Sequence, residues 1–107
     1  MARDGLGDLE HQTMLALLQV GDDAYTAPIV EELATRTGRE TSVAAAYIVL
    51  RRLEEKGLVR SEMRGPGDEG GRDRRHFTVT ESGLERLQQA RARYTALWDG
   101  LDATLGR

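Results

Sequence analysis

The sequence contains no cysteine, which excludes disulfide bonds, thiol redox sensing and cysteine-based metal sites. It also has no apolar run long enough to span a bilayer and no pattern typical of a secretory signal. From these absences we expect a cytoplasmic protein that does not act at a membrane.

Patterns typical of enzymes are missing as well. No Ser/His/Asp arrangement, phosphate-binding loop or paired-carboxylate site stands out. The two histidines, His11 and His76, are far apart in the sequence, so we do not expect them to bind a metal together. The glycine-rich segment 65–71 lacks the lysine of a phosphate-binding loop. We therefore predict no enzymatic activity, no cofactor and no metal.

What the chain has is the composition of one small, soluble domain. Its 107 residues allow one domain at most, with 39% hydrophobic and 31% charged residues. The formal net charge of −3 argues against a nucleic-acid partner. However, acidic side chains dominate residues 1–40, whereas basic side chains are in slight excess in residues 41–80. A nucleic acid would therefore be expected to contact the second of these segments.

Hydrophobic periodicity predicts three short helices in the first half of the chain. The first spans residues 8–20, and the second spans residues 26–37 and is ended by Gly38. After a tight connection, Ser42 caps the third helix. Two short helices joined by such a turn form a helix-turn-helix unit.

The third helix has two distinct faces when it is plotted at about 100° per residue. One face is apolar and is expected in the core: Ala46, Val49, Leu50 and Leu53. The exposed side is predicted to contact DNA through Ser42, Ala44, Tyr47, Ile48, Arg51 and Arg52. Small residues allow close approach to the major groove, Tyr47 and Arg51 can reach a phosphate or a base edge, and Ile48 can contact a thymine methyl. The alternative is an ordinary solvated helix face.

Two strands are predicted next, over residues 58–64 and 72–80, joined by the glycine-rich tip. Three arginines flank this hairpin, namely Arg72, Arg74 and Arg75, and such side chains can enter the minor groove or bind phosphate. Asp68, Glu69 and Asp73 dilute the positive charge, so a solvated hairpin of mixed charge is the alternative. The predicted fold is therefore mostly α with a small β-hairpin, a winged helix-turn-helix.

A last helix is predicted from the Thr80 cap through Leu105. Its apolar residues recur at intervals of three and four, as in a heptad seam interrupted only by Arg91. The seam comprises Leu84, Leu87, Arg91, Tyr94, Trp98, Leu101 and Leu105. Because it extends past the winged helix, we expect a second copy of the chain to cover it, forming a two-fold dimer that binds palindromic DNA. Packing on the first helix of the same chain is the alternative.

With these elements in place, the chain resembles PadR-family transcriptional regulators of the short type with a single C-terminal helix. The resemblance covers about residues 8–105. It is carried by the segments LALLQVGDDAYTAPIVEEL, AAAYIVLRRLEEKGLV and GGRDRRHFTVTESGLERL. The second of these is similar to the family signature Tyr-x-x-Leu-x-x-Leu-Glu-x-x-Gly-Leu, and the third to its basic wing followed by Thr-x-x-Gly.

The resemblance implies a homodimeric repressor with a DNA-binding domain over residues 1–80 and a dimerisation helix over residues 81–107. It also implies that Tyr94 and Trp98 can line an interface pocket for a small aromatic effector, although these rings can equally pack the dimer alone. Two positions depart from the family pattern, because Thr26 replaces a usual glycine and Asp73 interrupts the basic wing. The alternative function is a winged-helix module that binds another protein instead of DNA.

Overall fold

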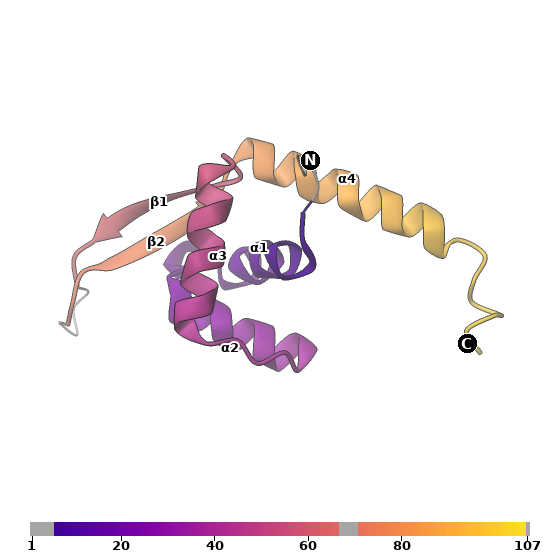
Figure 1. Ribbon diagram of the computed structural model, residues 1–107, viewed down its shortest axis with the longest axis horizontal. Helices are drawn as coiled ribbons and strands as arrows, with labels where there is room; N and C mark the ends of the chain where they lie inside the picture. The colour runs from indigo at the N-terminus through magenta and orange to yellow at the C-terminus, as the bar shows by residue number, and fades with distance from the viewer. Residues whose placement is uncertain (1–5, 67–70, 107) are drawn as a thin grey trace.

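The computed structural model describes residues 6–66 and 71–106, and within them it contains four α-helices and a two-stranded hairpin. In chain order these elements are α1 (Asp8–Val20), a short 3-10 turn η1 (Gly21–Asp23), α2 (Thr26–Thr37), α3 (Val43–Glu55), β1 (Val59–Arg64), β2 (Arg74–Val79) and α4 (Glu81–Trp98). Figure 1 shows α1, α2 and α3 gathered in one body, with the hairpin projecting on one side and α4 on the other. The predicted winged helix-turn-helix, mostly α with a small hairpin, is confirmed.

The turn between α2 and α3 forms where the sequence predicted it. Gly38 ends α2 in the left-handed conformation, with φ of 75°, and donates its N–H to the carbonyl of Ala34. Ser42 begins α3, because its hydroxyl oxygen accepts a hydrogen bond from the N–H of Ala45 at 3.0 Å. These two local signals set the direction of α3 relative to α2.

The core lies between the three short helices and the hairpin. The α3 residues predicted to face inward, Ala46, Val49, Leu50 and Leu53, are all buried. Three of them, Val49, Leu50 and Leu53, meet Met14 and Leu17 from α1, Ile29 and Leu33 from α2, and Val59 and Phe77 from the hairpin. None of the helices in the described part of the chain has the length and apolar character needed to cross a membrane.

The hairpin is antiparallel and slightly shorter than predicted. Its register runs from the pair Val59 and Val79 at the base to the pair Arg64 and Arg74. The N–H of Phe77 donates to the carbonyl of Ala24 at 2.8 Å, so β2 is also tied to the segment that precedes α2. The predicted tip residues 67–70, which include Asp68 and Glu69, lie outside the described residues.

The end of α3, the base of the hairpin and the start of α4 meet at one junction. Gly57 adopts a φ of 77°, and the following N–H of Leu58 donates back to the carbonyl of Leu53 at 3.0 Å. The Leu58 carbonyl then accepts from the N–H of Thr80 at 3.0 Å, while the Thr80 hydroxyl donates to the Gly57 carbonyl at 2.7 Å. The same hydroxyl oxygen accepts from the N–H of Gly83 at 3.1 Å and caps α4, as predicted.

Gly83 packs directly on this junction. A Cβ atom at this position would lie 2.1 Å from the Leu58 carbonyl oxygen, 2.7 Å from Cγ1 of Val79 and 3.0 Å from Cε of Met14. Only glycine therefore allows α4 to approach the base of the hairpin this closely. We refer to this contact, with the hydrogen bonds of Thr80, as the Leu58–Gly83 junction.

The C-terminal helix is shorter than the heptad spacing predicted. It ends at Trp98, because Asp99 leaves the helical conformation and Gly100 adopts a φ of 80°. The prediction that the helix continues through Leu101 and Leu105 is therefore wrong: both residues follow the helix and are exposed.

Leu87 also departs from its predicted place in the seam. It is buried in the core of its own chain, where Ala90 on the same helix is buried too. It is therefore not available to a partner helix. Apolar periodicity could not distinguish a residue that packs in the core of its own chain from one that is left for a partner helix. The same side of α4 packs on the body near its start and is exposed further along.

An ion pair holds the start of α1 against the end of α3. Nζ of Lys56 lies 2.8 Å from Oε2 of Glu10, and the N–H of Gly7 donates to Oε1 of Glu10 at 3.0 Å. Burial alone would raise the pKa of Glu10. The hydrogen bonds from Lys56 and Gly7 outweigh that effect and hold the pKa below its ordinary value.

The Leu58–Gly83 junction predicts that Gly83→Ala destabilises the protein by about 1–3 kcal/mol, as overpacking does. Helix propensity alone would act in the opposite direction, because alanine is favoured over glycine in a helix by about 1 kcal/mol. The sign of the change therefore separates the two effects in chemical denaturation. The neighbouring exposed substitution Ser82→Ala is the control and should stay within about 0.5 kcal/mol of the original protein. A Gly83→Ala variant as stable as the original would show that the close contact does not exist.

Candidate nucleic-acid interface

The exposed side of α3 lies next to the hairpin (Figure 1). All six residues predicted there to contact DNA are exposed: Ser42, Ala44, Tyr47, Ile48, Arg51 and Arg52. Val43, which the sequence analysis did not single out, is 51% exposed, close to the 52% of Ile48. This surface therefore combines aliphatic side chains near the start of α3 with polar side chains further along it.

Five of the polar side chains form a connected group between α3 and the hairpin. Arg51 donates to the hydroxyl of Tyr47 at 3.2 Å and pairs with the Glu54 carboxylate at 3.3 Å. The hydroxyl of Ser61 donates to the same carboxylate, at 2.9 and 2.8 Å from its two oxygens. Arg75 completes the group by donating to Ser61 Oγ at 2.9 Å. We call these five residues the helix–wing cluster.

The cluster contains two residues that the sequence analysis missed, Glu54 and Ser61. Glu54 follows Arg51 by three positions, a spacing that places both side chains on one side of a helix and could have indicated the pair. Ser61 carried no local signal. Its position depends on the hairpin register, which sets Ser61 opposite Phe77 and Met63 opposite Arg75. That register places Ser61 and Arg75 on the same face of the hairpin.

The arginines of the cluster change the ionisation of Tyr47. The hydrogen bond from the Arg51 guanidinium lowers the pKa of the Tyr47 phenol most, burial acts against it, and Arg75 lowers the pKa further. The Tyr47 ring also packs edge-on against Phe77, with 6.2 Å between ring centroids. Tyr47 is thus held in place by both a polar and an apolar contact.

The other arginines predicted to bind DNA lie apart from the cluster. Arg52 faces α1 and lines an open cavity of about 700 Å³ with Glu10 and Lys56. The Arg74 guanidinium lies 4.4 Å above the ring of Tyr25. Arg72 is exposed and precedes β2. The structure therefore brings together Tyr47, Arg51 and Arg75 from the predicted set.

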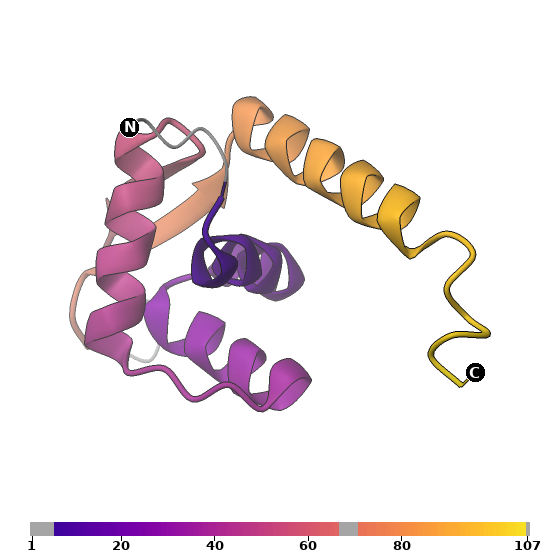
Figure 2. The same ribbon diagram turned by 45° about the vertical axis from the view of Figure 1, so that its right-hand side comes forward.

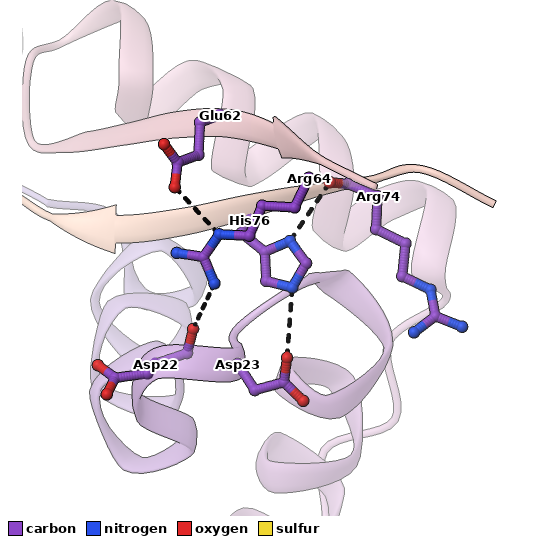
Figure 3. A network of polar contacts seen from close by, with 6 residues as sticks. All are labelled: Asp22, Asp23, Glu62, Arg64, Arg74 and His76. Atoms are coloured by element: carbon purple, nitrogen blue, oxygen red, sulfur yellow. Dashed lines mark hydrogen bonds and ion pairs between the residues drawn. The ribbon is translucent and has the colours of Figure 1, made fainter. Parts of the chain in front are cut away.

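A second group of contacts holds the opposite face of the hairpin to the body (Figure 3). His76 is buried, with Nε2 at 3.3 Å from Oδ1 of Asp23 and Nδ1 at 3.3 Å from the carbonyl oxygen of Arg74. Arg64 donates to the backbone carbonyl of Asp22 at 3.0 Å. The contacts of His76 with Asp23 and of Arg64 with Asp22 reach the η1 turn and hold the hairpin from the side away from α3.

The second half of α4 exposes apolar side chains that pack on little of their own chain. Figure 2 shows this half of the helix leaving the body. Leu97 is 71% exposed, and Tyr94 and Trp98 are each 56% exposed. The Tyr94 ring stacks on His11 of α1, beside a cavity of about 240 Å³. Leu84, which is 42% exposed, lies instead in the first turn of α4, beside the body. We call Tyr94, Leu97 and Trp98 the α4 apolar face.

Comparison with known proteins identifies a family for this arrangement. The model of the transcriptional regulator PadR-like family matches residues 14–89, which span α1 to the middle of α4. None of the curated proteins is significantly similar to the chain.

Solved structures of similar fold agree with the family match. A PadR family transcriptional regulator from Eggerthella lenta is 32% identical, with 87% of this chain and 80% of that chain covered and a TM-score of 0.67. A PadR family regulator from Clostridium difficile is 19% identical, with 92% and 99% covered and a TM-score of 0.75. A Streptococcus transcriptional regulator is 24% identical, with 92% and 98% covered and a TM-score of 0.67.

The helix–wing cluster predicts an early-ionising tyrosine. Tyr47 should lose its proton at a lower pH than an ordinary tyrosine and give an early phase when the absorbance of tyrosinate is followed against pH, because two guanidinium groups lower the pKa of its phenol. Tyr47→Phe should remove that early phase, and Arg51→Gln should return the pKa toward its ordinary 10.0. Tyr94→Phe serves as the matched control and should leave the early phase in place. If the early phase survives Tyr47→Phe, the cluster does not act on Tyr47.

Proposed function

The chain belongs to the PadR-like family of transcriptional regulators, and we propose that it acts as a homodimeric repressor that binds a palindromic DNA operator. The observation that carries this proposal is the helix–wing cluster. It joins Arg51 on α3 to Arg75 on β2 through Ser61 and Glu54, with Arg51 exposed and the other three half-buried. A helix-turn-helix places such a helix in the major groove, and the wing then lies beside the duplex.

The charges on this surface suit phosphate contacts of moderate strength. Arg51, Arg75 and the hydroxyl of Tyr47 supply hydrogen-bond donors, and charge-assisted hydrogen bonds to phosphate are among the stronger ones. Glu54 neutralises part of the positive charge, and a phosphate would compete with it for Arg51. We therefore expect binding that weakens steeply with salt and relies on a correct fit to the base pairs.

The α4 apolar face supports the dimer. Its side chains continue along the helix beyond the body of the chain, and Leu97 and Trp98 leave large apolar areas in contact with water. A second copy of the same helix, related by a two-fold axis, covers this face most simply. The two recognition helices would then face successive major grooves of a palindrome.

Release by a small aromatic ligand is the regulatory part of the proposal. Tyr94 and Trp98 offer flat rings on which such a ligand can stack, and the cavity beside Tyr94 offers space. The dimer would have two states that differ in the spacing of the recognition helices. The ligand would shift the equilibrium between them only by the difference in its affinity for the two states.

To test DNA binding, the full chain is used to select bound duplexes from a random-sequence pool. The selected duplex and a scrambled control duplex are then each titrated with the protein at two salt concentrations. We expect selective, salt-sensitive binding. Arg51→Gln should weaken it by about tenfold or more, as the loss of a phosphate or base contact does. Arg93→Gln removes an exposed arginine from α4 and serves as the matched control.

Two results would count against this reading. If the protein selects no sequence even at low salt, the winged helix is better explained as a protein-binding module. If selection succeeds but Arg51→Gln binds as well as the original, α3 does not provide the DNA surface.

The dimer is tested by the double substitution Leu97→Asp and Trp98→Asp. Both side chains are largely exposed, so the fold should persist, while the two buried charges would prevent the helices from pairing. Light scattering should then report the chain mass of 11.9 kDa instead of twice that value. Val43→Asp, at an exposed apolar position on α3, should leave the dimer intact. A dimer that survives the double substitution would place the interface elsewhere.

A further inference from the structure

We infer that α3 reads its DNA site mainly through thymine methyl groups, by apolar contact instead of hydrogen bonds to base edges. This inference rests on the proposed function and specifies which base pairs that function selects. It comes from the side chains that α3 presents at its N-terminal end, the part of a recognition helix that reaches base edges in a helix-turn-helix.

The exposed side chains of the first turns of α3 are almost all aliphatic. Val43 and Ile48 are 51% and 52% exposed, and Ala44 and Ala45 are exposed between them. Large aliphatic side chains in water cost free energy, and nothing in the described part of the chain packs over these two. Ala44 and Ile48 are four residues apart, so they lie one above the other on the same side of the helix.

The polar side chains around this patch are already engaged. The hydroxyl oxygen of Ser42 caps α3 by accepting from Ala45. The Tyr47 hydroxyl is held by Arg51, and Arg51 is also paired with Glu54. Residues 43–50 include no Arg, Lys, Asn, Gln, Asp or Glu. The side chains that usually form paired hydrogen bonds with guanine or adenine are therefore missing from the first two turns.

The major groove offers one apolar group to such a surface, the C5 methyl of thymine. An aliphatic side chain pressed against any other base edge would remove water from donors and acceptors without replacing their hydrogen bonds, which is unfavourable. Ala44 and Ile48 are separated by about 6 Å along the helix axis, close to two base-pair steps of duplex. The patch therefore fits thymines within about two base-pair steps of each other in each half-site.

The size of the effect follows from the burial of one methyl group. Removing it should weaken binding by about fourfold at one position, as the transfer of one CH₂ group predicts. In a two-fold dimer the same change in both half-sites should weaken binding by about tenfold or more, because the two contacts are far apart and nearly additive.

The experiment uses the duplex selected by the full chain, with each thymine replaced in turn by uracil. Uracil keeps every hydrogen-bonding group and lacks only the methyl. We expect about a fourfold loss at particular thymines within each half-site. Ile48→Ala should weaken binding to the thymine duplex, and uracil at the contacted position should then cause no further loss. Leu15→Ala, at an exposed apolar position on α1, is the matched control and should leave the full uracil effect in place.

Each outcome decides the inference. Selective binding that is unchanged by uracil at every position would overturn it while leaving the proposed function intact. A uracil effect that persists undiminished in both Ile48→Ala and Val43→Ala would show that another part of the chain reads the methyl, and would overturn the assignment to α3. If the chain selects no DNA sequence at all, the inference falls together with the proposed function.

Discussion

The contact between the Leu58 carbonyl and the backbone of Gly83 is the constraint on which the arrangement of this protein depends. At this point α3 ends, the hairpin begins and ends, and α4 starts. Thr80 completes the junction with hydrogen bonds to Gly57 and Leu58. Because one small group of backbone atoms fixes all these directions, the helix–wing cluster and the α4 apolar face are held in a defined relation. In our proposal, a change in how two α4 helices pair would therefore move the two α3 helices with them.

In our proposal, the helix–wing cluster allows an acidic protein to bind DNA. With a formal net charge of −3, long-range attraction to DNA is weak, so binding must depend on local groups. Glu54 holds Ser61 and Arg51, and Ser61 holds Arg75, so contacts within the chain itself order the two arginine side chains. Such ordering reduces the entropy lost on binding. In our proposal, this smaller entropy loss compensates in part for the attraction to DNA that is lost because Glu54 neutralises positive charge.

Local signals in the sequence predicted much of this fold. The features that depend on contacts between distant segments of the chain were not predicted. Ser42 and Gly38 mark the ends of helices through short-range hydrogen bonds and backbone conformation, so they could be predicted without knowing the rest of the structure. The helix α4 is shorter than the heptad spacing predicts, because the chain leaves the helical conformation at Asp99 and Gly100 although the apolar spacing continues to Leu105. The roles of Ser61 and Leu87 depend on hairpin register and on which surface a helix covers. Neither is visible in a single segment of sequence.

The central claim, that the exposed side of α3 meets DNA, is tested most directly by methyl NMR of the isoleucines. The chain has only two, and they differ in environment: Ile29 on α2 is fully buried in the core, whereas Ile48 is half exposed on α3. With ¹³C-labelled isoleucine methyl groups, the selected duplex should shift the Ile48 signal strongly and produce contacts to thymine methyl protons, while Ile29 stays nearly unchanged. An Ile48 signal that does not move when the duplex is bound would contradict the account.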